Sequence, residues 1–426
     1  SYTVANGNGD AFFEIRNGGV LNLSGTTSLT CAPTGAGFRV GEASAGTLNV
    51  TAGSHSYSPI SGSNFVIGRT ANANGTVNIT GGTLTVTGAG GFSMANDANT
   101  IGTLNISGTG SLVATCATFR IGGNASSTSA VINLNAGGSF TLGVSPTSAG
   151  ASRVLNFDGG TLRAAADITV GGLTEANIKD GGAIVDTNGS TITMSQSLLN
   201  GAGATTATLT KNGAGTLRLT GANTYTGNTS VTAGTLELVG GSQASSVVVS
   251  AGASLGFTLE SPTTSTGTFN LSAGTIKITG TPTLNSYDLI SSSAGITGTP
   301  VLDAPITGYE LKVDGNSLKL VKAGYASWAA VNAIGSAANL DKDADGVSNG
   351  VEYVLGGDVN TNDLGKLPTL DASGANLVFT FKRDRDSLDG STAVVIEVGD
   401  NLTGWPDVFT VGTTTGTSTA GVTVTE

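Results

Sequence analysis

One short phrase recurs in the chain with a period of about 27 residues: Phe38-Arg-Val-Gly41, Phe65-Val-Ile-Gly68, Phe92-Ser-Met-Ala95 and Phe119-Arg-Ile-Gly122. A second phrase recurs in nearly the same phase: Leu21-Asn-Leu23, Leu48-Asn-Val50, Val77-Asn-Ile79, Leu104-Asn-Ile106 and Ile132-Asn-Leu134. Apolar and polar residues alternate in the second phrase, which is the pattern of a half-buried strand, so we expect Leu48 and Val50 to point inward and Asn49 outward. A fixed period of about 20 to 50 residues predicts a solenoid, whose coils bury their apolar sides by stacking.

After residue 150 the strict period fades, but short alternating runs continue. They are Ala183–Val185, Thr191–Met194, Thr216–Leu219, Thr235–Leu238 and Thr275–Ile278. Glycine-rich corners separate them, and glycine permits the positive φ angles that such corners need. The pattern therefore predicts an all-β protein in which residues 1–322 form one parallel β-helix, or β-solenoid, with coils of about 27 residues.

Composition agrees with this class and excludes others. The 426 residues include 66 glycines, and only 11% are charged, which is unusual for a mixed α/β enzyme. With 18 Lys and Arg residues and a net charge of −11, we expect no nucleic-acid partner. No run of about 18 apolar residues occurs, so we expect no membrane span. The sequence begins with Ser1 and not with a methionine. We therefore expect that a secretion signal has been removed and that the protein is extracellular or at the cell surface.

One segment carries a family resemblance. Residues 211–240 read Lys-Asn-Gly-Ala-Gly-Thr-Leu-Arg-Leu-Thr-Gly-Ala-Asn-Thr-Tyr-Thr-Gly-Asn-Thr-Ser-Val-Thr-Ala-Gly-Thr-Leu-Glu-Leu-Val-Gly. The segment resembles the autotransporter-associated β-strand repeat of bacterial passenger domains, and this implies a secreted or surface-exposed bacterial β-helix. We see no amphipathic strands of a translocator barrel, so the chain is more similar to the large secreted repeat proteins that share the motif and lack the barrel.

A different motif follows the solenoid. Residues 341–352 read Asp-Lys-Asp-Ala-Asp-Gly-Val-Ser-Asn-Gly-Val-Glu, which matches the 12-residue calcium loop. Gly346 permits the sharp turn at position six, and oxygen atoms recur at the positions that a hard cation needs. The expected Ca²⁺ ligands are Asp341, Asp343, Asp345, the Val347 carbonyl, Asn349 directly or through water, and Glu352 with both oxygens. The loop also resembles thrombospondin type 3-like and dockerin-like loops. We expect residues 323–365 to form a structural calcium-binding linker with short helices.

The last part of the chain changes pattern again. Leu377–Phe381, Ala393–Val398 and Val422–Val424 are strand-like and predict a small antiparallel, β-sandwich-like module over residues 366–426. Its unpaired strand edges are candidate sites for pairing with another chain.

The residues of the solenoid do not predict an enzyme. Its acidic residues are isolated, whereas polysaccharide lyases and hydrolases need acidic or basic groups gathered on one face. The acids concerned are Asp158, Asp167, Asp180 and Asp186. His55 is the single histidine and stands in a loop-like stretch, where we expect it to be solvated. We therefore expect no catalytic activity, and a polysaccharide-degrading β-helix enzyme remains the less favoured alternative.

Two non-enzymatic functions remain. We favour an extracellular structural protein, a subunit of a surface fibre, filament or matrix that self-assembles into a homopolymer through head-to-tail or strand-exchange contacts. The alternative is an adhesin that binds polysaccharide or another cell-surface polymer, or, less favoured, ice. It is based on the outward Thr and Asn residues, which align between phrases: Thr47, Asn49 and Thr51 with Thr76, Asn78 and Thr80 and with Thr103, Asn105 and Ser107.

Overall fold

The structure is a computed structural model, and the protein it shows is all-β and only 4% helical. It describes residues 2–4, 12–25, 29–31, 37–123, 128–284, 286–332, 334, 337–374, 378–384, 387–388, 392–398, 406–412, 417–420 and 422–424. Within these residues, no helix has both the length and the apolar character that crossing a membrane requires.

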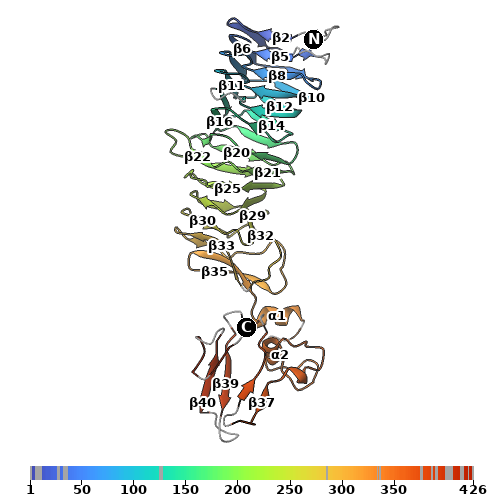
Figure 1. The fold of residues 1–426 in the computed structure, drawn as a ribbon, viewed down its shortest axis with the longest axis vertical. Helices are drawn as coiled ribbons and strands as arrows, with labels where there is room; N and C mark the ends of the chain where they lie inside the picture. The colour runs from blue at the N-terminus through green and yellow to red at the C-terminus, as the bar shows by residue number, and fades with distance from the viewer. Residues whose placement is uncertain are drawn as a thin grey trace. The chain divides into compact units, whose positions relative to one another are not determined.

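The chain divides into two compact units. The first comprises residues 1–280, 289–303 and 313–318, and the second comprises residues 281–288, 304–312 and 319–426. The first unit is the parallel β-solenoid that the repeated phrases predict, and its strands follow one another as the rungs of a ladder (Figure 1).

One face of the N-terminal solenoid is an eight-stranded parallel sheet that contains the Asn-centred phrases. Its strands, in order, are β3 (Gly19–Leu23), β6 (Ala45–Val50), β9 (Asn74–Ile79), β11 (Ile101–Ile106), β13 (Ser129–Asn135), β16 (Ser152–Asp158), β19 (Glu175–Ile178) and β22 (Leu198–Asn200). Leu48 and Val50 are fully buried and Asn49 is half-buried, which confirms the predicted inward and outward positions.

A 17-stranded parallel sheet forms two further columns. The longer column contains β1 (Tyr2–Val4), β4 (Leu29–Cys31), β7 (Ser54–Tyr57), β10 (Thr83–Met94), β12 (Ser111–Ile121), β14 (Ser139–Leu142), β17 (Thr161–Ala164), β20 (Ala183–Asp186), β23 (Leu209–Asn212), β25 (Thr229–Val231), β28 (Val247–Val249), β31 (Phe269–Asn270) and β34 (Ile296–Thr297). The shorter column contains β2 (Phe12–Ile15), β5 (Gly37–Val40), β8 (Asn64–Ile67) and β15 (Thr147–Ser148). The long strands β10 and β12 belong to both columns, which joins them into one sheet.

Further along the chain, another parallel sheet forms a new face. Its strands are β18 (Ile168–Val170), β21 (Thr191–Met194), β24 (Thr216–Leu219), β26 (Gly234–Leu238), β29 (Ala253–Thr258) and β32 (Thr275–Thr279). A short ladder adds β27 (Ser242–Gln243), β30 (Thr263–Ser265) and β33 (Ser286–Ser292), and the strands β35 (Tyr309–Asp314) and β36 (Ser317–Lys322) follow. All five alternating runs expected after residue 150 are strands.

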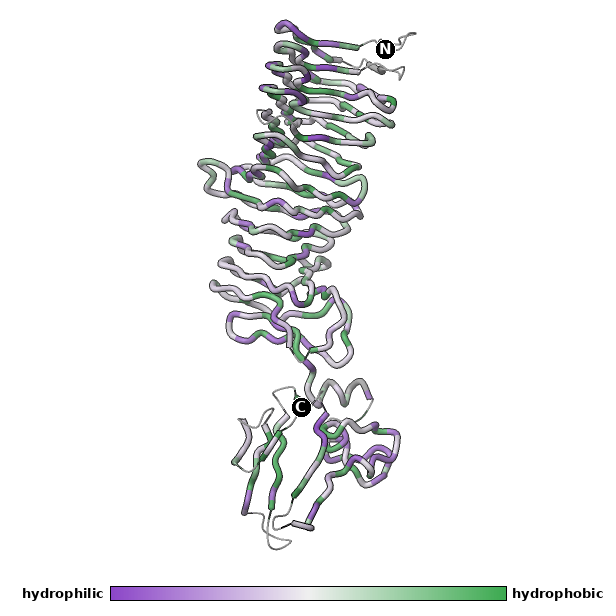
Figure 2. Tube along the Cα trace, viewed as in Figure 1, coloured by the Kyte–Doolittle hydropathy of each residue, from purple (hydrophilic) through white to green (hydrophobic). Residues whose placement is uncertain are grey.

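Repeated residues meet in the core because the parallel register places identical positions on top of one another. Phe38, Phe65, Phe92 and Phe119 pair with one another in successive strands, and their rings stack with centroids 4.7–5.0 Å apart. Figure 2 shows hydrophobic and hydrophilic residues interspersed along the coils of the solenoid. A buried phenylalanine contributes a large apolar area, so this stack is a major part of the N-terminal core.

Coil length is not constant. The coil that runs from Phe38 to its partner Phe65 is clearly longer than the coil that runs from Thr216 to its partner Thr235. Near the end of the solenoid, the coil from Phe269 to its partner Ile296 is long again. The change in coil length explains why the periodicity in the sequence fades in the middle of the solenoid although the stacking continues.

The second unit contains two short helices, α1 (Tyr325–Val331) and α2 (Asn349–Leu355), and the 3₁₀ turn η1 (Leu364–Lys366). Two antiparallel hairpins follow, one of β37 (Thr369–Asp371) and β38 (Val378–Thr380), the other of β39 (Val394–Val398) and β40 (Asp407–Val411). The alternating pattern predicts β38 and β39. Their partner strands β37 and β40 were not predicted. Val422–Val424, expected to be a strand, is not part of one, and Leu377 lies outside the described residues.

Candidate metal centre

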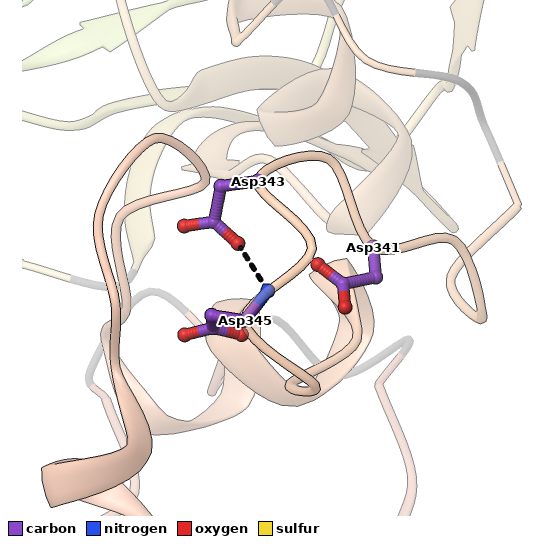
Figure 3. A group of neighbouring side chains, drawn as sticks. All are labelled: Asp341, Asp343 and Asp345. Carbon is purple, nitrogen blue, oxygen red and sulfur yellow. Dashed lines mark hydrogen bonds between the residues drawn. The ribbon is translucent and has the colours of Figure 1, made fainter.

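The loop that precedes α2 brings three aspartates together. The carboxylate oxygens of Asp341, Asp343 and Asp345 lie within 4.8 Å of one another (Figure 3). Backbone donors fix this arrangement: the Gly346 N–H donates to Asp341 Oδ2 at 2.9 Å, and the Asp345 N–H donates to Asp343 Oδ1 at 3.2 Å. Gly346 has a φ of 91°, which an L side chain rarely adopts, so glycine at this position makes the tight turn possible.

Glu352, in the first turn of α2, is not part of this three-aspartate group, but it lies near enough for the aspartate charges to act on it. Its side chain is buried, with 1% of the residue exposed, and neither of its oxygens has a hydrogen-bond partner. Burial, together with the charges of Asp343, Asp345, Asp363 and Asp341, raises the pKa of Glu352 to about 7. A buried carboxylate without donors is costly unless a cation compensates it.

Asp343 also has a buried carboxylate oxygen without a hydrogen-bond donor. Its Oδ2 is buried without a hydrogen-bond partner, and burial together with the nearby charges of Asp345 and Asp341 raises its pKa. Three buried carboxylate oxygens, one from Asp343 and two from Glu352, thus lack donors. Since Ca²⁺ prefers six to eight oxygen ligands that include a bidentate glutamate, the donor set fits this ion well.

The helix that carries Glu352 is held on both sides. It follows Ser348, whose backbone is extended, and ends at Gly356 in the left-handed conformation, with a φ of 70°. Tyr353 of α2 packs against Tyr325 and Trp328 of α1, with ring centroids 5.7 and 5.3 Å away. The Tyr353 hydroxyl donates to the Ala323 carbonyl. This aromatic cluster anchors the helix, and with it the glutamate.

The other two predicted ligands are also in the loop. Val347 is buried, and its N–H donates to Asp345 Oδ1 at 2.7 Å. Asn349 is buried as well, and its Oδ1 accepts from the Lys342 N–H at 3.2 Å, so the side chain braces the two ends of the loop. The participation of all six predicted residues as metal ligands, Val347 and Asn349 included, stays a prediction.

The motif did not include Asp363, which the fold brings to the same place. Asp363 is 8% exposed, and its charge contributes to the raised pKa of Glu352. Its N–H donates to Asp345 Oδ2 at 2.5 Å. Asp363 lies 18 residues beyond Asp345 in an irregular turn. In the sequence, only the acidic side chains of this segment, Asp358 and Asp363, could have indicated that it contributes to the site.

The acidic residues of the solenoid are not gathered. In the part of the chain that the structure describes, the three loop aspartates are the one group of three or more His, Cys, Asp or Glu side chains with metal-binding spacing. Four solenoid aspartates each accept a backbone N–H instead: Asp158 from Gly181, Asp167 from Thr191, Asp180 from Thr205 and Asp186 from Asn188. The expectation of a solvated His55 was wrong, because this residue is 2% exposed in β7, with Nε2 2.9 Å from the Ala52 carbonyl.

Comparison with known proteins adds one result. The family model for the Passenger-associated-transport-repeat matches residues 209–238, which include β23, β24, β25 and β26. No match to the chain was found among curated proteins or among solved structures. The repeat and the β-solenoid together fit the β-helix of a secreted or cell-surface autotransporter passenger.

Proposed function

We propose that the chain is an extracellular structural protein, the subunit of a surface fibre or matrix. In this proposal the solenoid is a stiff non-catalytic shaft, and a Ca²⁺ ion held by the loop at residues 341–352 stabilises the C-terminal unit. Subunits associate through head-to-tail or strand-exchange contacts.

The main support is an asparagine ladder on the outward face of the eight-stranded sheet. Each Nδ2 donates to the Oδ1 of the asparagine in the preceding coil, over 2.7–3.1 Å, along Asn22, Asn49, Asn78, Asn105, Asn133, Asn156 and Asn177. These amide groups therefore hydrogen-bond along the stack and are less free to bind a ligand. A continuous ladder that links coils is a feature expected of a stiff shaft.

The calcium part of the proposal has its own support. The buried oxygens of Glu352 and Asp343 without donors are explained by a bound cation and are difficult to explain otherwise, because each costs desolvation free energy. A bound Ca²⁺ would supply the positive charge, and the carboxylate oxygens of the chain would coordinate it. The residues of the chain orient their carboxylates through the loop N–H groups and exclude water by burying Glu352.

A polysaccharide-binding surface remains the second candidate, and the threonines beside the ladder favour it. Thr47, Thr76 and Thr103 pair with one another in β6, β9 and β11 and give a column of hydroxyl groups in register. Hydroxyls at the spacing of successive strands, about 4.8 Å, can meet a repeating polymer. Specific retention on a glycan array, lost in Thr76→Val, would support this candidate over the structural one.

The structural proposal is tested by electron microscopy of the purified protein with calcium and with a chelator. We expect filaments or ordered lateral assemblies, reduced in length or number when calcium is removed. Single particles alone under both conditions would overturn the fibre proposal. Incubation with surface polysaccharides in the same buffers should release no reducing ends or unsaturated products, and such products would overturn the non-catalytic part.

A further inference from the structure

A turn outside the calcium motif contacts one of its aspartates directly. Asp363 precedes η1, and its backbone N–H donates to Asp345 Oδ2 at 2.5 Å. On the other side, Asp345 Oδ1 accepts from the Val347 N–H at 2.7 Å. Two backbone donors, one inside the loop and one outside it, therefore fix the plane of the Asp345 carboxylate.

The side chain of Asp363 holds this turn in place. Its Oδ2 accepts from the Asp358 N–H at 2.5 Å, and its Oδ1 lies 3.5 Å from Lys366 Nζ. Lys366 also donates to the Gly356 carbonyl, at the end of α2. The Asp363 side chain thus ties the segment from Gly356 to Lys366 into one closed turn and places its own N–H against Asp345.

Loss of this tie has a predictable consequence for the site. Without the Asp363 carboxylate, the Asp358 N–H loses its acceptor, and the turn can move away from Asp345. The Asp345 carboxylate would then be held by the Val347 N–H alone and would rotate more freely. Residues that orient metal ligands in this way commonly change affinity by about 10- to 100-fold when they are removed.

We infer that Asp363 is a positioning residue of the metal centre, which orients Asp345 toward the ion and thereby sets the calcium affinity. This inference rests on the calcium site proposed above. Asp363 acts through hydrogen-bond geometry, because its oxygens are already directed at Asp358 and Lys366.

Two substitutions separate geometry from charge. Asp363→Ala removes the acceptor for the Asp358 N–H, whereas Asp363→Asn keeps an acceptor oxygen and removes the charge. We expect the alanine variant to bind calcium about tenfold or more weakly, and the asparagine variant to stay within about threefold of the wild type. Asp407→Asn, an exposed change in β40, is the control for loss of one negative charge.

Terbium bound in place of calcium gives a readout that a purely structural role would not change. The luminescence lifetimes of Tb³⁺ in H₂O and D₂O report the number of waters on the ion. We expect one additional water in Asp363→Ala, because Asp345 no longer coordinates firmly, and none in Asp363→Asn. Equal losses of affinity in both variants, or unchanged hydration in the alanine variant, would overturn the inference.

The result also distinguishes this inference from the proposal on which it rests. If the wild type binds neither calcium nor terbium, the calcium site itself is wrong. If the wild type binds and Asp363→Ala binds equally well, only the role of Asp363 is wrong. The tryptophan emission spectrum of each variant, measured with calcium, checks that the second unit is folded.

Discussion

Glu352 combines a charge, deep burial and the absence of any donor to its two oxygens. Replacing it with glutamine should abolish detectable calcium binding, because the amide cannot supply the second oxygen of a bidentate ligand. Isothermal titration with calcium measures this directly. Glu397→Gln, an exposed change in β39, is the matched control and should bind as the wild type does. Unchanged binding by Glu352→Gln would exclude Glu352 as a ligand.

Lys211 is a second buried ion, and it lies in the segment that the repeat family matches. Its ammonium is fully buried and donates to the carbonyls of Asn212, Gly213 and Ala233 at 2.7–3.0 Å. Burial lowers its pKa to about 8, an effect that Asp186 partly opposes. The lysine therefore links its own corner to that of the next coil.

This lowered pKa predicts how stability depends on pH. Above pH 8 the folded chain releases a proton from Lys211, whereas the unfolded chain keeps it up to about 10.5, so the unfolded state binds more protons in this window. The free energy of unfolding should rise with pH, by at most about 1.4 kcal/mol per pH unit. Urea titrations at pH 8 and 9.5 should show this slope in the wild type. It should be missing in Lys211→Met, and an equal slope in both proteins would contradict the prediction.

At the scale of the strand, the asparagine ladder makes each coil depend on its neighbours. Asn78 in β9 donates to Asn49 and accepts from Asn105, so Asn78→Ala removes one hydrogen bond from each of these two amides and interrupts the ladder. We expect the free energy of unfolding to fall by about 1–3 kcal/mol. Thr76→Ala, on the same face of the same strand, should cost clearly less. Chemical denaturation measures the free energy of unfolding of both variants. Equal losses in the two variants would show that the ladder does not contribute to stability.

The close approach of successive coils leaves no room for a side chain at Gly75 of the same strand. A Cβ atom on Gly75 would lie 2.1 Å from the Val40 carbonyl oxygen in the preceding coil. Gly75→Ala should therefore shift the backbone of β9 and lower the free energy of unfolding by about 1–3 kcal/mol. Gly365→Ala is the control, because a Cβ there meets nothing within 4 Å. A Gly75→Ala protein as stable as the wild type would contradict this packing.

At the scale of the whole molecule, the two units can be followed separately. Both tryptophans, Trp328 and Trp405, belong to the segment 319–426 of the second unit, whereas most strands belong to the first. Removing calcium should lower the unfolding temperature seen by tryptophan fluorescence and leave the main β-sheet transition in circular dichroism unchanged, since ligand binding stabilises only the unit that binds. A common shift of both signals would show that the units unfold together.

The sequence by itself determined the solenoid and the position of the calcium motif. A residue that recurs once in every coil meets its own copy in the next one, so periodicity alone predicts that Phe65 stacks on Phe38 and that Asn49 aligns with Asn22. The calcium motif is equally local, because Asp341 and Glu352 are joined by one short loop. In both cases, spacing along the chain nearly specifies spacing in three dimensions.

Only the tertiary structure decided the contacts that spacing does not specify. A shorter coil continues the stack between Thr216 and Thr235, the Lys211 ammonium bridges two corners, and His55 is buried in a strand expected to be a loop. Asp363 reaches Asp345 through an irregular turn, which has no period from which its position could be predicted. Periodic segments bring equivalent residues together, whereas irregular turns bring together residues whose proximity depends on how the whole chain folds.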